Sequence, residues 1–482
     1  MTPTLIFTSF AVYTLLLFIV SFLTSGRSDN QTFFLGNRQS PWYVVAYGMI
    51  GASLSGVTFI SIPGDVGNTQ FSYMVIVLGY LLGYFVIARV LLPIYYKLQL
   101  TSIYTYLEKR LGFWSYKTGA VFFLISRIIG ASFRMFLVVN VLQIFVFDAW
   151  GIPFQATVAL FIILIMLYTF RSGIRTIVWT DTLQTTFMLL AVILTLVFIS
   201  GEMGWALPDL VREISNSEYS RMFITAWQDR HFVVKDFLAG MFIAIVMTGL
   251  DQDMMQKNLS CRNLRDAQKN VYWLSFSLVP VNFLFLCLGA VLWIYSTHIS
   301  GFPAMGTTDE LFPLIALQYL GPAAGITFII GLIAAAYSSA DSALTALTTS
   351  FSVDILGIDR NMAGSARRKT RMRYAVHIAI SFVVFLVIVG FNTINDRSVI
   401  SALFTIAGYT YGPLLGMFAF GLFTRYSVRD AYVPLIAILS PAICYLLSVY
   451  DQQLFGGYDF GFELLLVNGF LTFTGLLLVH KK

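Results

Sequence analysis

Hydroxyl and carboxyl side chains interrupt an apolar stretch near residue 340. The stretch reads GLIAAAYSSADSALTALTTSFSVDI from Gly331. One helix face, at the spacing i, i+3, i+4 and i+7, would carry Ser338, Asp341, Ser342 and Thr345. Hard oxygen donors of this kind suit a small hard cation such as sodium once it has shed its water. A lone hydroxyl more often bonds its own helix, but the cluster with Asp341 favours a cation site.

Three further charged side chains stand inside apolar stretches. Asp181, in RTIVWTDTLQTTFM, is either a cation ligand or a residue that favours the helix dipole near a helix start. Arg127 and Arg134 are seven residues apart in FFLISRIIGASFRMFLVVN, so both point the same way from a helix. A buried guanidinium needs an acid or an anionic ligand. Either an anionic solute or one of Asp181, Asp251 and Asp341 would supply it.

Glycines interrupt two of the apolar stretches. The first reads GMIGASLSGVTFISIPG from Gly48, and the second reads AGMFIAIVMTGLDQDMM from Ala239. They lie five expected spans apart, so each would open one half of a two-part bundle. Broken helices at matching positions of two halves indicate a transporter site near the middle of the membrane, because the freed carbonyls need a partner in lipid. The alternative is that the glycines only permit close helix packing.

The elements that must position these residues are membrane-spanning helices. Of the 482 residues, 58% are hydrophobic and 11% are charged, whereas a soluble protein carries about a quarter charged residues. A span needs about 20 apolar residues. Thirteen candidates run roughly over 3–25, 41–63, 73–97, 117–147, 153–170, 177–201, 236–256, 271–296, 323–355, 374–391, 399–424, 431–450 and 460–479.

Basic residues predict the orientation of these spans. Of the 30 Lys and Arg residues, 22 fall in loops on one side, with Lys257 counted among them, and five fall on the other. Because inner loops carry the excess of positive charge, we expect the N-terminus outside and the C-terminus inside a cell (plasma) membrane. The net charge of +6 then reflects topology, and no nucleic-acid partner is expected. The longest outer loop, 202–235, should form short helices over the outer mouth.

The chain lacks the usual marks of an enzyme. Its three cysteines and four histidines show no metal-ligand spacing, and no nucleophile elbow or phosphate-binding loop occurs. We therefore expect no catalytic residues, no organic cofactor and no obligate protein partner. The expected partners are a small solute and the lipid bilayer. One transmembrane domain should span 1–482.

Several motifs in order make the chain resemble the sodium:solute symporter family, which includes sodium/glucose, proline, sialic acid, iodide and monocarboxylate carriers. The resemblance covers almost the whole chain. Its motifs are SGVTFISIP from Ser55, YYKLQLTSIYTYLEKRLG from Tyr95, RSGIRTIVWTDTLQ from Arg171, DQDMMQKNLSCRNLRDAQK from Asp251 and AAAYSSADSALTALTTSFSVDI from Ala334.

The resemblance implies an all-α integral membrane fold like that of the leucine transporter, with two inverted five-helix repeats. The ten core helices would occupy 41–430, an extra helix and inner loop 1–40, and two more helices 431–482. The family's conserved sodium site, carried over, implies the backbone carbonyls of Gly51, Leu54 and Ala335 with the hydroxyls of Ser338 and Ser339.

A second cation site is implied by the likeness to the sialic acid carrier, which uses a carboxylate on the fifth core helix. That pattern matches Asp181 with Ser338 and Ser342. Where the pattern has another hydroxyl, this chain has Asp341, which could tighten the site, couple it to protons or change its stoichiometry.

The substrate positions match less well. The gating tyrosine and the lysine of the sugar carriers have no counterpart in AIVMTGLDQD and SFSLVPV, whereas Arg127 falls where the sialic acid carrier has an arginine. The resemblance therefore favours sodium-coupled import of an organic anion, and a sodium/sugar symporter or an ion channel is the alternative. The expected substrate residues are Ser53, Ser55, Thr58, Arg127, Arg134 and Asp251.

Overall fold

The computed structural model describes residues 1–24, 30–169, 174–358, 366–393, 399–458 and 460–481. The chain is built of helices, joined at one end by a short antiparallel pair of strands, β1 (Ser427–Val428) and β2 (His480–Lys481). Five basic residues counted in the predicted loops lie outside the described residues, namely Arg27, Arg171, Arg360, Arg397 and Lys482.

Within the described residues, ten helical segments are long and apolar enough to cross a membrane, and a bent pair makes an eleventh. The ten contain α1 (Pro3–Thr24), α3 (Trp42–Thr69), α4 (Tyr73–Val86), α7 (Phe113–Leu142), α9 (Ile174–Glu202), α13 (Leu264–Thr297), α15 (Gly321–Ser350), α17 (Ala366–Asn392), α18 (Val399–Phe423) and α19 (Val433–Val449). The bent pair is α11 (Val233–Ala244) with α12 (Gln252–Leu259). The two remaining expected spans are the shorter apolar helices α8 (Phe154–Thr169) and α21 (Leu464–Leu478), so the count of thirteen stays a prediction.

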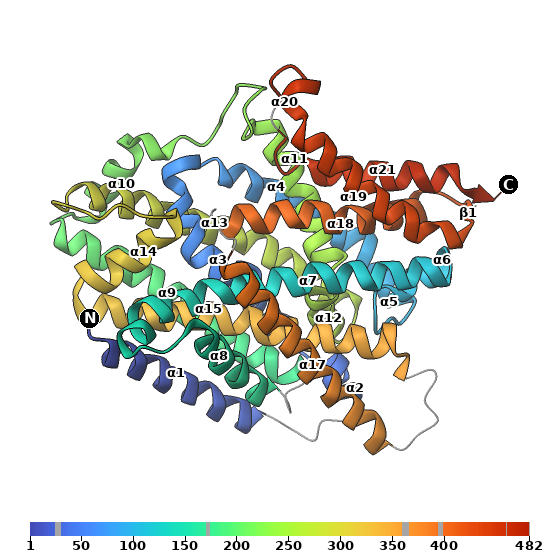
Figure 1. The fold of residues 1–482 in the computed structure, drawn as a ribbon, viewed down its shortest axis with the longest axis horizontal. Helices are drawn as coiled ribbons and strands as arrows, with labels where there is room; N and C mark the ends of the chain where they lie inside the picture. Colours follow the sequence, from blue (N-terminus) through green and yellow to red (C-terminus); the bar gives the residue numbers. More distant parts are fainter. Residues whose placement is uncertain (25–29, 170–173, 359–365, 394–398, 459, 482) are drawn as a thin grey trace.

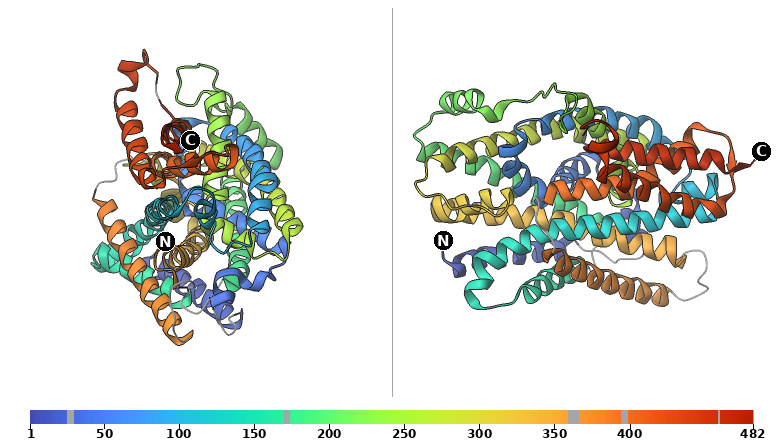
Figure 2. Two further views of the ribbon diagram at one scale, coloured as in Figure 1. Left: turned by 90° about the vertical axis from the view of Figure 1, so that its right-hand side faces the viewer. Right: turned by 45° about the horizontal axis from the view of Figure 1, so that its top comes forward.

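Short helices connect the long ones. They are α2 (Asn30–Leu35), α5 (Leu92–Lys97), α6 (Thr105–Arg110), α10 (Leu207–Asn216), α14 (Leu311–Leu314) and α20 (Asp451–Leu454). The presence of α10 agrees with the expectation of short helices in the loop 202–235. The long helices run side by side between two ends of the molecule, and the chain termini lie at opposite ends (Figures 1 and 2).

Helix α3 is the innermost element. In its most apolar window 89% of the residues are buried, against 33% in α1 and 22% in α19. It packs on α7, α9, α13 and α15, so little of it besides its start, where Tyr43 is exposed, faces lipid. Irregular backbone is tolerated at membrane depth only where protein or a water-filled cavity surrounds it, and α3 meets that condition.

Glycines bring α4 and α11 unusually close together. A Cβ on Gly240 of α11 would overlap the backbone of Ile76 on α4, and one on Gly79 would overlap the carbonyl of Phe237. Small residues at such contacts let two helix backbones approach and gain dispersion energy. Gly240 therefore has a packing role, which is the alternative considered for the glycines of the second interrupted stretch.

At one end of the bundle, two charged side chains hold neighbouring helices together through hydrogen bonds to backbone groups. Arg110, at the end of α6, donates to the carbonyls of Gly421 and Tyr426, at 3.0 and 3.1 Å, just where α18 ends. Asp430 accepts from the amides of Trp114 and Ser115, at 2.6 and 2.9 Å. These amides belong to the first turn of α7, where helix N–H groups lack intrahelical partners, and a carboxylate there also favours the helix dipole.

The opposite end holds a water-accessible cavity of about 710 Å³, which we call the vestibule. Its lining includes Asp65, Arg230, His231, Tyr73 and Phe404. Tyr73 and Phe404 also line a deeper pocket, so the two spaces adjoin at these rings, which stack at 6.4 Å between centroids. The protein thus has the vestibule at one end and the backbone contacts of Arg110 and Asp430 at the other.

A buried acid outside the spans connects two elements at the vestibule end. Asp309, in the loop before α14, accepts from the amide of Val399 at the start of α18, at 3.0 Å. Burial raises the pKa of Asp309 from 3.8 to about 6, and nearby Asp65 and Glu310 add to the rise. The folded protein therefore holds a proton between about pH 4 and 6 that the unfolded chain has released, so stability falls as pH rises through that window.

Replacement of Asp309 by Asn should remove this loss, because the amide oxygen can still accept the Val399 N–H and carries no charge. We expect the variant to gain stability over the parent as pH is raised from 4.5 to 7, by up to about 3 kcal/mol at the upper end. Thermal unfolding of the detergent-purified protein measures this, with Glu310→Gln as the control for loss of a negative charge. An Asp309→Asn difference that is the same at both pH values would contradict the assignment.

Candidate functional site

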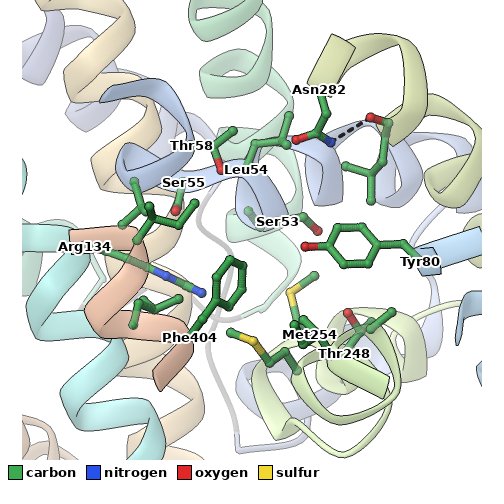
Figure 3. A pocket seen from close by; sticks show the side chains of 18 of the residues that line it. Ser53, Leu54, Ser55, Thr58, Tyr80, Arg134, Thr248, Met254, Asn282 and Phe404 are labelled. Carbon is green, nitrogen blue, oxygen red and sulfur yellow. Dashed lines mark hydrogen bonds between the residues drawn. The ribbon is translucent and has the colours of Figure 1, made fainter. Parts of the chain in front are cut away.

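A pocket lies where the two interrupted helices meet. Its water-accessible volume is about 90 Å³, and it is the space that adjoins the vestibule. Helix α3 contributes residues from Ala52 to Thr58, and the bent pair contributes Ile243 to Thr248 and Met254. Ser53, Tyr80 and Arg134 direct polar groups into it, with Phe404 along one side (Figure 3).

The break in α3 falls at Ser55. This residue has φ 37° and ψ 177°, a conformation that L-residues rarely adopt and that persists only where the surroundings enforce it. The deviation interrupts the i to i+4 ladder, so carbonyls of the preceding turn lose their usual partners. The prediction of an interrupted helix here is confirmed, and the interruption lies at the wall of the pocket.

The second break separates α11 from α12. A π-helical turn, Ile245–Gly249, ends α11, and the axis then bends by 65°. Asp251 begins α12 as its N-cap, since its Oδ1 accepts from the amides of Asp253 and Met254 at 2.8 and 3.2 Å. Its other oxygen accepts from the hydroxyl of Tyr411 at 2.5 Å. The predicted substrate residue Asp251 is thus engaged in holding the break.

The two arginines of α7 have different surroundings. Arg127 forms an ion pair with Asp253, and its other nitrogen lies 3.8 Å from Asp251. Arg134 lies two turns away and is 8% exposed, and among the described residues the structure shows no ion pair to it. Arg127 therefore has the structural partner that the sequence left open, whereas Arg134 presents an unpaired guanidinium to the pocket (Figure 3).

The serine-rich face lies on α15, as expected, but its side chains have separate partners. Ser338 donates to Asp181 on α9 at 2.8 Å, and Ser342 donates to Asp253 on α12. Asp341 accepts from the hydroxyl of Tyr168 on α8 at 2.7 Å. The structure therefore brings Asp181 and Ser338 together and directs Ser342 to a different carboxylate.

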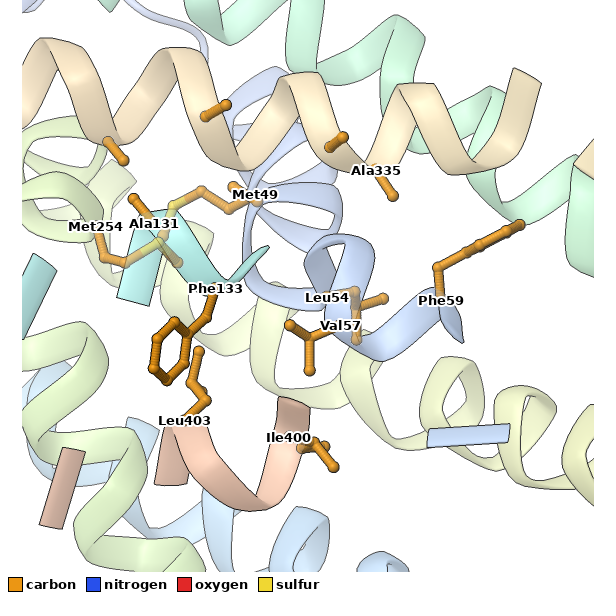
Figure 4. Packing of buried hydrophobic residues seen from close by; sticks show 14 of the residues in the cluster. Met49, Leu54, Val57, Phe59, Ala131, Phe133, Met254, Ala335, Ile400 and Leu403 are labelled. Carbon is orange, nitrogen blue, oxygen red and sulfur yellow. The ribbon is translucent and has the colours of Figure 1, made fainter. Parts of the chain in front are cut away.

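The predicted sodium ligands belong to α3 and α15, two helices that pack on each other. Helix α15 passes the broken segment of α3, with Ala335 and Leu54 labelled on the two helices in Figure 4. The hydroxyl of Ser339 donates to the carbonyls of Ala335 and Ala336, at 3.3 and 3.1 Å. Its oxygen keeps lone pairs for a further partner. Two of the expected ligands, the Ser339 hydroxyl and the Ala335 carbonyl, are therefore in contact.

Thr185 on α9 contacts the turn of α3 that precedes the break. Its hydroxyl accepts from the amide of Gly51 at 3.0 Å and lies 3.4 Å from the carbonyl of Gly48. A Cβ on Gly51 would overlap that hydroxyl, and one on Gly48 would lie 2.9 Å from the Cβ of Asp181. Glycine at these positions lets α9 approach the turn before the break, so here the packing and site explanations both apply.

Lys257 pairs with Asp181 and corrects the loop assignment. The sequence placed it in an inner loop, but it lies within α12, is 1% exposed and donates to Asp181 Oδ2 at 2.7 Å. Asp181 could instead have favoured the dipole at a helix start. The structure gives it a stronger interaction, because Asp181 is 1% exposed and forms an ion pair with Lys257.

Two of the residues that sequence reasoning missed or misplaced share one signal. Asp253 and Lys257 are four residues apart just after the second break, so one turn of helix separates them. The span assigned from hydropathy ended at 256, which left Lys257 outside it. Tyr168 and Thr185 gave no signal of their own, because single hydroxyls in apolar helices usually bond their own backbone.

Comparison with known proteins bears on this arrangement. The model of the family described as "Sodium:solute symporter family" matches residues 33–431. The sodium/sialic acid symporter SiaT of Proteus mirabilis is 22% identical over 450 residues, covering 91% of this chain and 88% of that protein. Human sodium-coupled monocarboxylate transporter 1 is 24% identical, covering 84% of this chain and 66% of that protein.

Solved structures show the same fold. The substrate-bound, outward-open state of a Na⁺-coupled sialic acid symporter superposes with a TM-score of 0.83 at 19% identity and covers 99% of each chain. The nucleobase-cation-symport-1 family transporter MHP1, in a closed conformation, gives a TM-score of 0.56 at 12% identity, covering 93% of this chain and 94% of that one. The match of the family model over most of the chain makes this multi-pass membrane protein a member of the sodium:solute symporter family.

Proposed function

We propose that this protein imports a small organic anion together with sodium by alternating access. The observation that carries the proposal is the pocket between two broken helices, into which Arg134 presents an unpaired guanidinium. Half-helix ends and unwound backbone at membrane depth are the means by which transporters bind ions and solutes. Each sodium ion that moves inward adds about 2.3 kcal/mol per 100 mV of membrane potential to drive the solute.

The sodium ion would bind between the break of α3 and the serine-rich face of α15. The proposed ligands are the carbonyls of Gly51, Leu54 and Ala335 and the hydroxyls of Ser338 and Ser339. Support comes from the strained backbone at Ser55, which frees carbonyls beside α15, and from the contact of Ser339 with Ala335. Neutral oxygens suffice for a monovalent ion. Among the described residues no three acidic, His or Cys side chains gather as a divalent metal site.

An anion is favoured over a sugar by the electrostatics of the pocket. An arginine buried without an acid is stabilised when a carboxylate ligand forms paired hydrogen bonds with its fork of donors. Ser53, Ser55 and Thr58 line the same pocket and could bind solute oxygens. Several relatives carry sialic acid, monocarboxylates or iodide by name, all of them anions. Arg127 and Asp251, engaged with each other and with Asp253 and Tyr411, would position the wall of the pocket.

The finer architecture is part of the proposal. The core, 41–430, would form two inverted five-helix repeats, flanked by 1–40 and 431–482, giving thirteen spans in all. Supporting this, the two broken helices meet at one pocket although five expected spans separate them, and the termini lie at opposite ends (Figure 1). The vestibule end, which holds the N-terminus, would face outside and the opposite end, with the C-terminus, would face inside.

Replacement of Ser339 by Ala should weaken sodium binding, because it removes one proposed ligand and leaves the helix intact. We expect the sodium concentration for half-maximal uptake into proteoliposomes to rise at least about tenfold, which corresponds to 1.4 kcal/mol. Ser381→Ala is the matched control, since the Ser381 hydroxyl also donates to a carbonyl of its own helix, on α17. Equal sodium dependence in Ser339→Ala and the parent would refute this ligand.

The two arginines of α7 provide an internal comparison. Arg127→Gln leaves Asp253 and Asp251 buried without their cation, so we expect a loss of about 3–5 kcal/mol of stability. Arg134→Gln leaves no carboxylate unpaired, so it should unfold like the parent while losing sodium-dependent uptake of carboxylates. Thermal unfolding and an uptake screen of sialic acids, short carboxylates and sugars measure both. Undiminished carboxylate uptake in Arg134→Gln, or sodium-driven uptake of a neutral sugar by the parent, would favour the sugar alternative.

A further inference from the structure

The pocket between the broken helices is small. Its water-accessible volume is about 90 Å³. Because one water molecule needs roughly 10–15 Å³ of such volume, and bonded atoms lie closer together than waters, the pocket holds about ten non-hydrogen atoms at most. A sialic acid, with its sugar ring, glycerol chain and N-acetyl group, is far larger. The vestibule has room for such a solute, at about 710 Å³, but Arg134 does not line it.

The middle of the pocket is apolar. Leu54 lies on one side of it, and Met254 and Phe404 lie on the other (Figure 3). The hydroxyls of Tyr73 and Tyr80, which also line it, already share a hydrogen bond at 3.2 Å. Buried polar groups are costly when they lack partners, so this space suits a short hydrocarbon body better than a polyhydroxylated ring.

One polar atom of the lining has no partner. Asn282 on α13 is 1% exposed, and its Nδ2 donates to the carbonyl of Leu278, one turn earlier, at 2.7 Å. That bond leaves Oδ1 on the side toward Leu54, and within the described part of the chain no hydrogen bond reaches this oxygen (Figure 3). A buried acceptor without a donor favours a ligand that supplies one and rejects an analogue that does not.

The two ends of the pocket differ in charge. Arg134 enters from α7 and Asn282 from α13, on opposite sides of the space in Figure 3. The described residues that line the pocket include no Asp or Glu. An ammonium group on the solute would therefore be buried without a carboxylate and near arginine, which is unfavourable, whereas a neutral hydroxyl can donate to Asn282 at little electrostatic cost.

We propose that the solute is a short hydroxycarboxylate of about ten non-hydrogen atoms or fewer. Its carboxylate binds Arg134, its hydrocarbon body lies between Leu54 and Phe404, and its terminal hydroxyl donates to Asn282 Oδ1. The proposal rests on the proposed function, because it takes the organic anion bound by Arg134 as its starting point. It adds a size limit and makes Asn282 a specificity-determining residue.

Sodium-dependent binding to the full-length, detergent-purified protein tests the proposal, with thermal unfolding as the readout. The probes are glycolate, β-hydroxypropionate and γ-hydroxybutyrate, each compared with the acid that has a methyl group in place of the terminal hydroxyl, namely propionate, butyrate and valerate. At the length that fits, we expect the hydroxy acid to bind at least about fivefold more tightly, because only it satisfies Asn282. The amino acid of that length should bind more weakly than either, and N-acetylneuraminate should not bind.

Replacement of Asn282 by Leu removes the acceptor and keeps a side chain of similar size. The methyl acid should then bind at least as tightly as the hydroxy acid, while both still require sodium. Asn140→Leu is the matched control, since Asn140 is a helical asparagine of α7 that lies outside this pocket, and it should keep the preference of the parent. If Asn282→Leu does not fold, the affinity ratios of the parent decide the question alone.

The outcomes separate this proposal from the proposed function. Equal affinities for hydroxy and methyl acids at every length, tighter binding of the amino acid, or sodium-dependent binding of N-acetylneuraminate would overturn the short hydroxycarboxylate and leave sodium-coupled carriage of a solute intact. A hydroxyl preference that survives in a folded Asn282→Leu would overturn the role of Asn282. If no carboxylate stabilises the parent in sodium, N-acetylneuraminate included, the proposed function itself fails.

Discussion

A charge in the middle of a lipid-solvated bundle must have a partner inside the protein, and the centre of this molecule follows from that constraint. Four carboxylates and three basic groups are buried where α3, α7, α9, α12 and α15 meet, namely Asp181, Asp251, Asp253, Asp341, Arg127, Arg134 and Lys257. Desolvation of each would cost several kcal/mol if it stood alone. Ion pairs, and a hydrogen bond from Tyr168 to Asp341, reduce that cost for every group but Arg134, which faces the pocket, and they fix which helices lie next to one another.

Helix α12 has a central part in this pairing. Within seven residues it carries the N-cap Asp251, the acid Asp253 that faces α7 and α15, and the base Lys257 that faces α9. The short helix is therefore held on three sides by charged or charge-assisted bonds, which are stronger than neutral ones. A displacement of α12 would affect the pocket and the serine-rich face together, because Met254 lines the pocket and Asp253 bonds both Arg127 of the pocket wall and Ser342 of the serine-rich face.

Sequence reasoning found the elements better than the contacts. The interrupted helices and the serine-rich face were predictable, because glycine spacing and helical periodicity are local properties of the chain. The partners of Arg127 and Asp181 were not, since several acids satisfied the same rule and only the fold decides between them. Lys257 was misplaced because a hydropathy window reads a lysine as the end of a span, whereas a buried acid on another helix can hold it inside.

The family resemblance reached further for the fold than for the solute. A backbone arrangement tolerates wide changes in sequence, whereas solute specificity depends on a few side chains at the site. The strain at Ser55 left no trace in the sequence either, since serine is not a residue type that marks a positive φ.

The bonds at the end opposite the vestibule imply which parts of the molecule travel together. The Arg110 side chain joins the end of α6 to the α18–α19 connection, and the Asp430 side chain joins that connection to the start of α7, each by two bonds to backbone groups. A passage to that side that keeps these bonds must therefore part other helices, with α6, α7 and the α18–α19 corner moving as a single rigid block. The packing of these helices therefore limits which helices can separate to form an exit path, whatever the solute is.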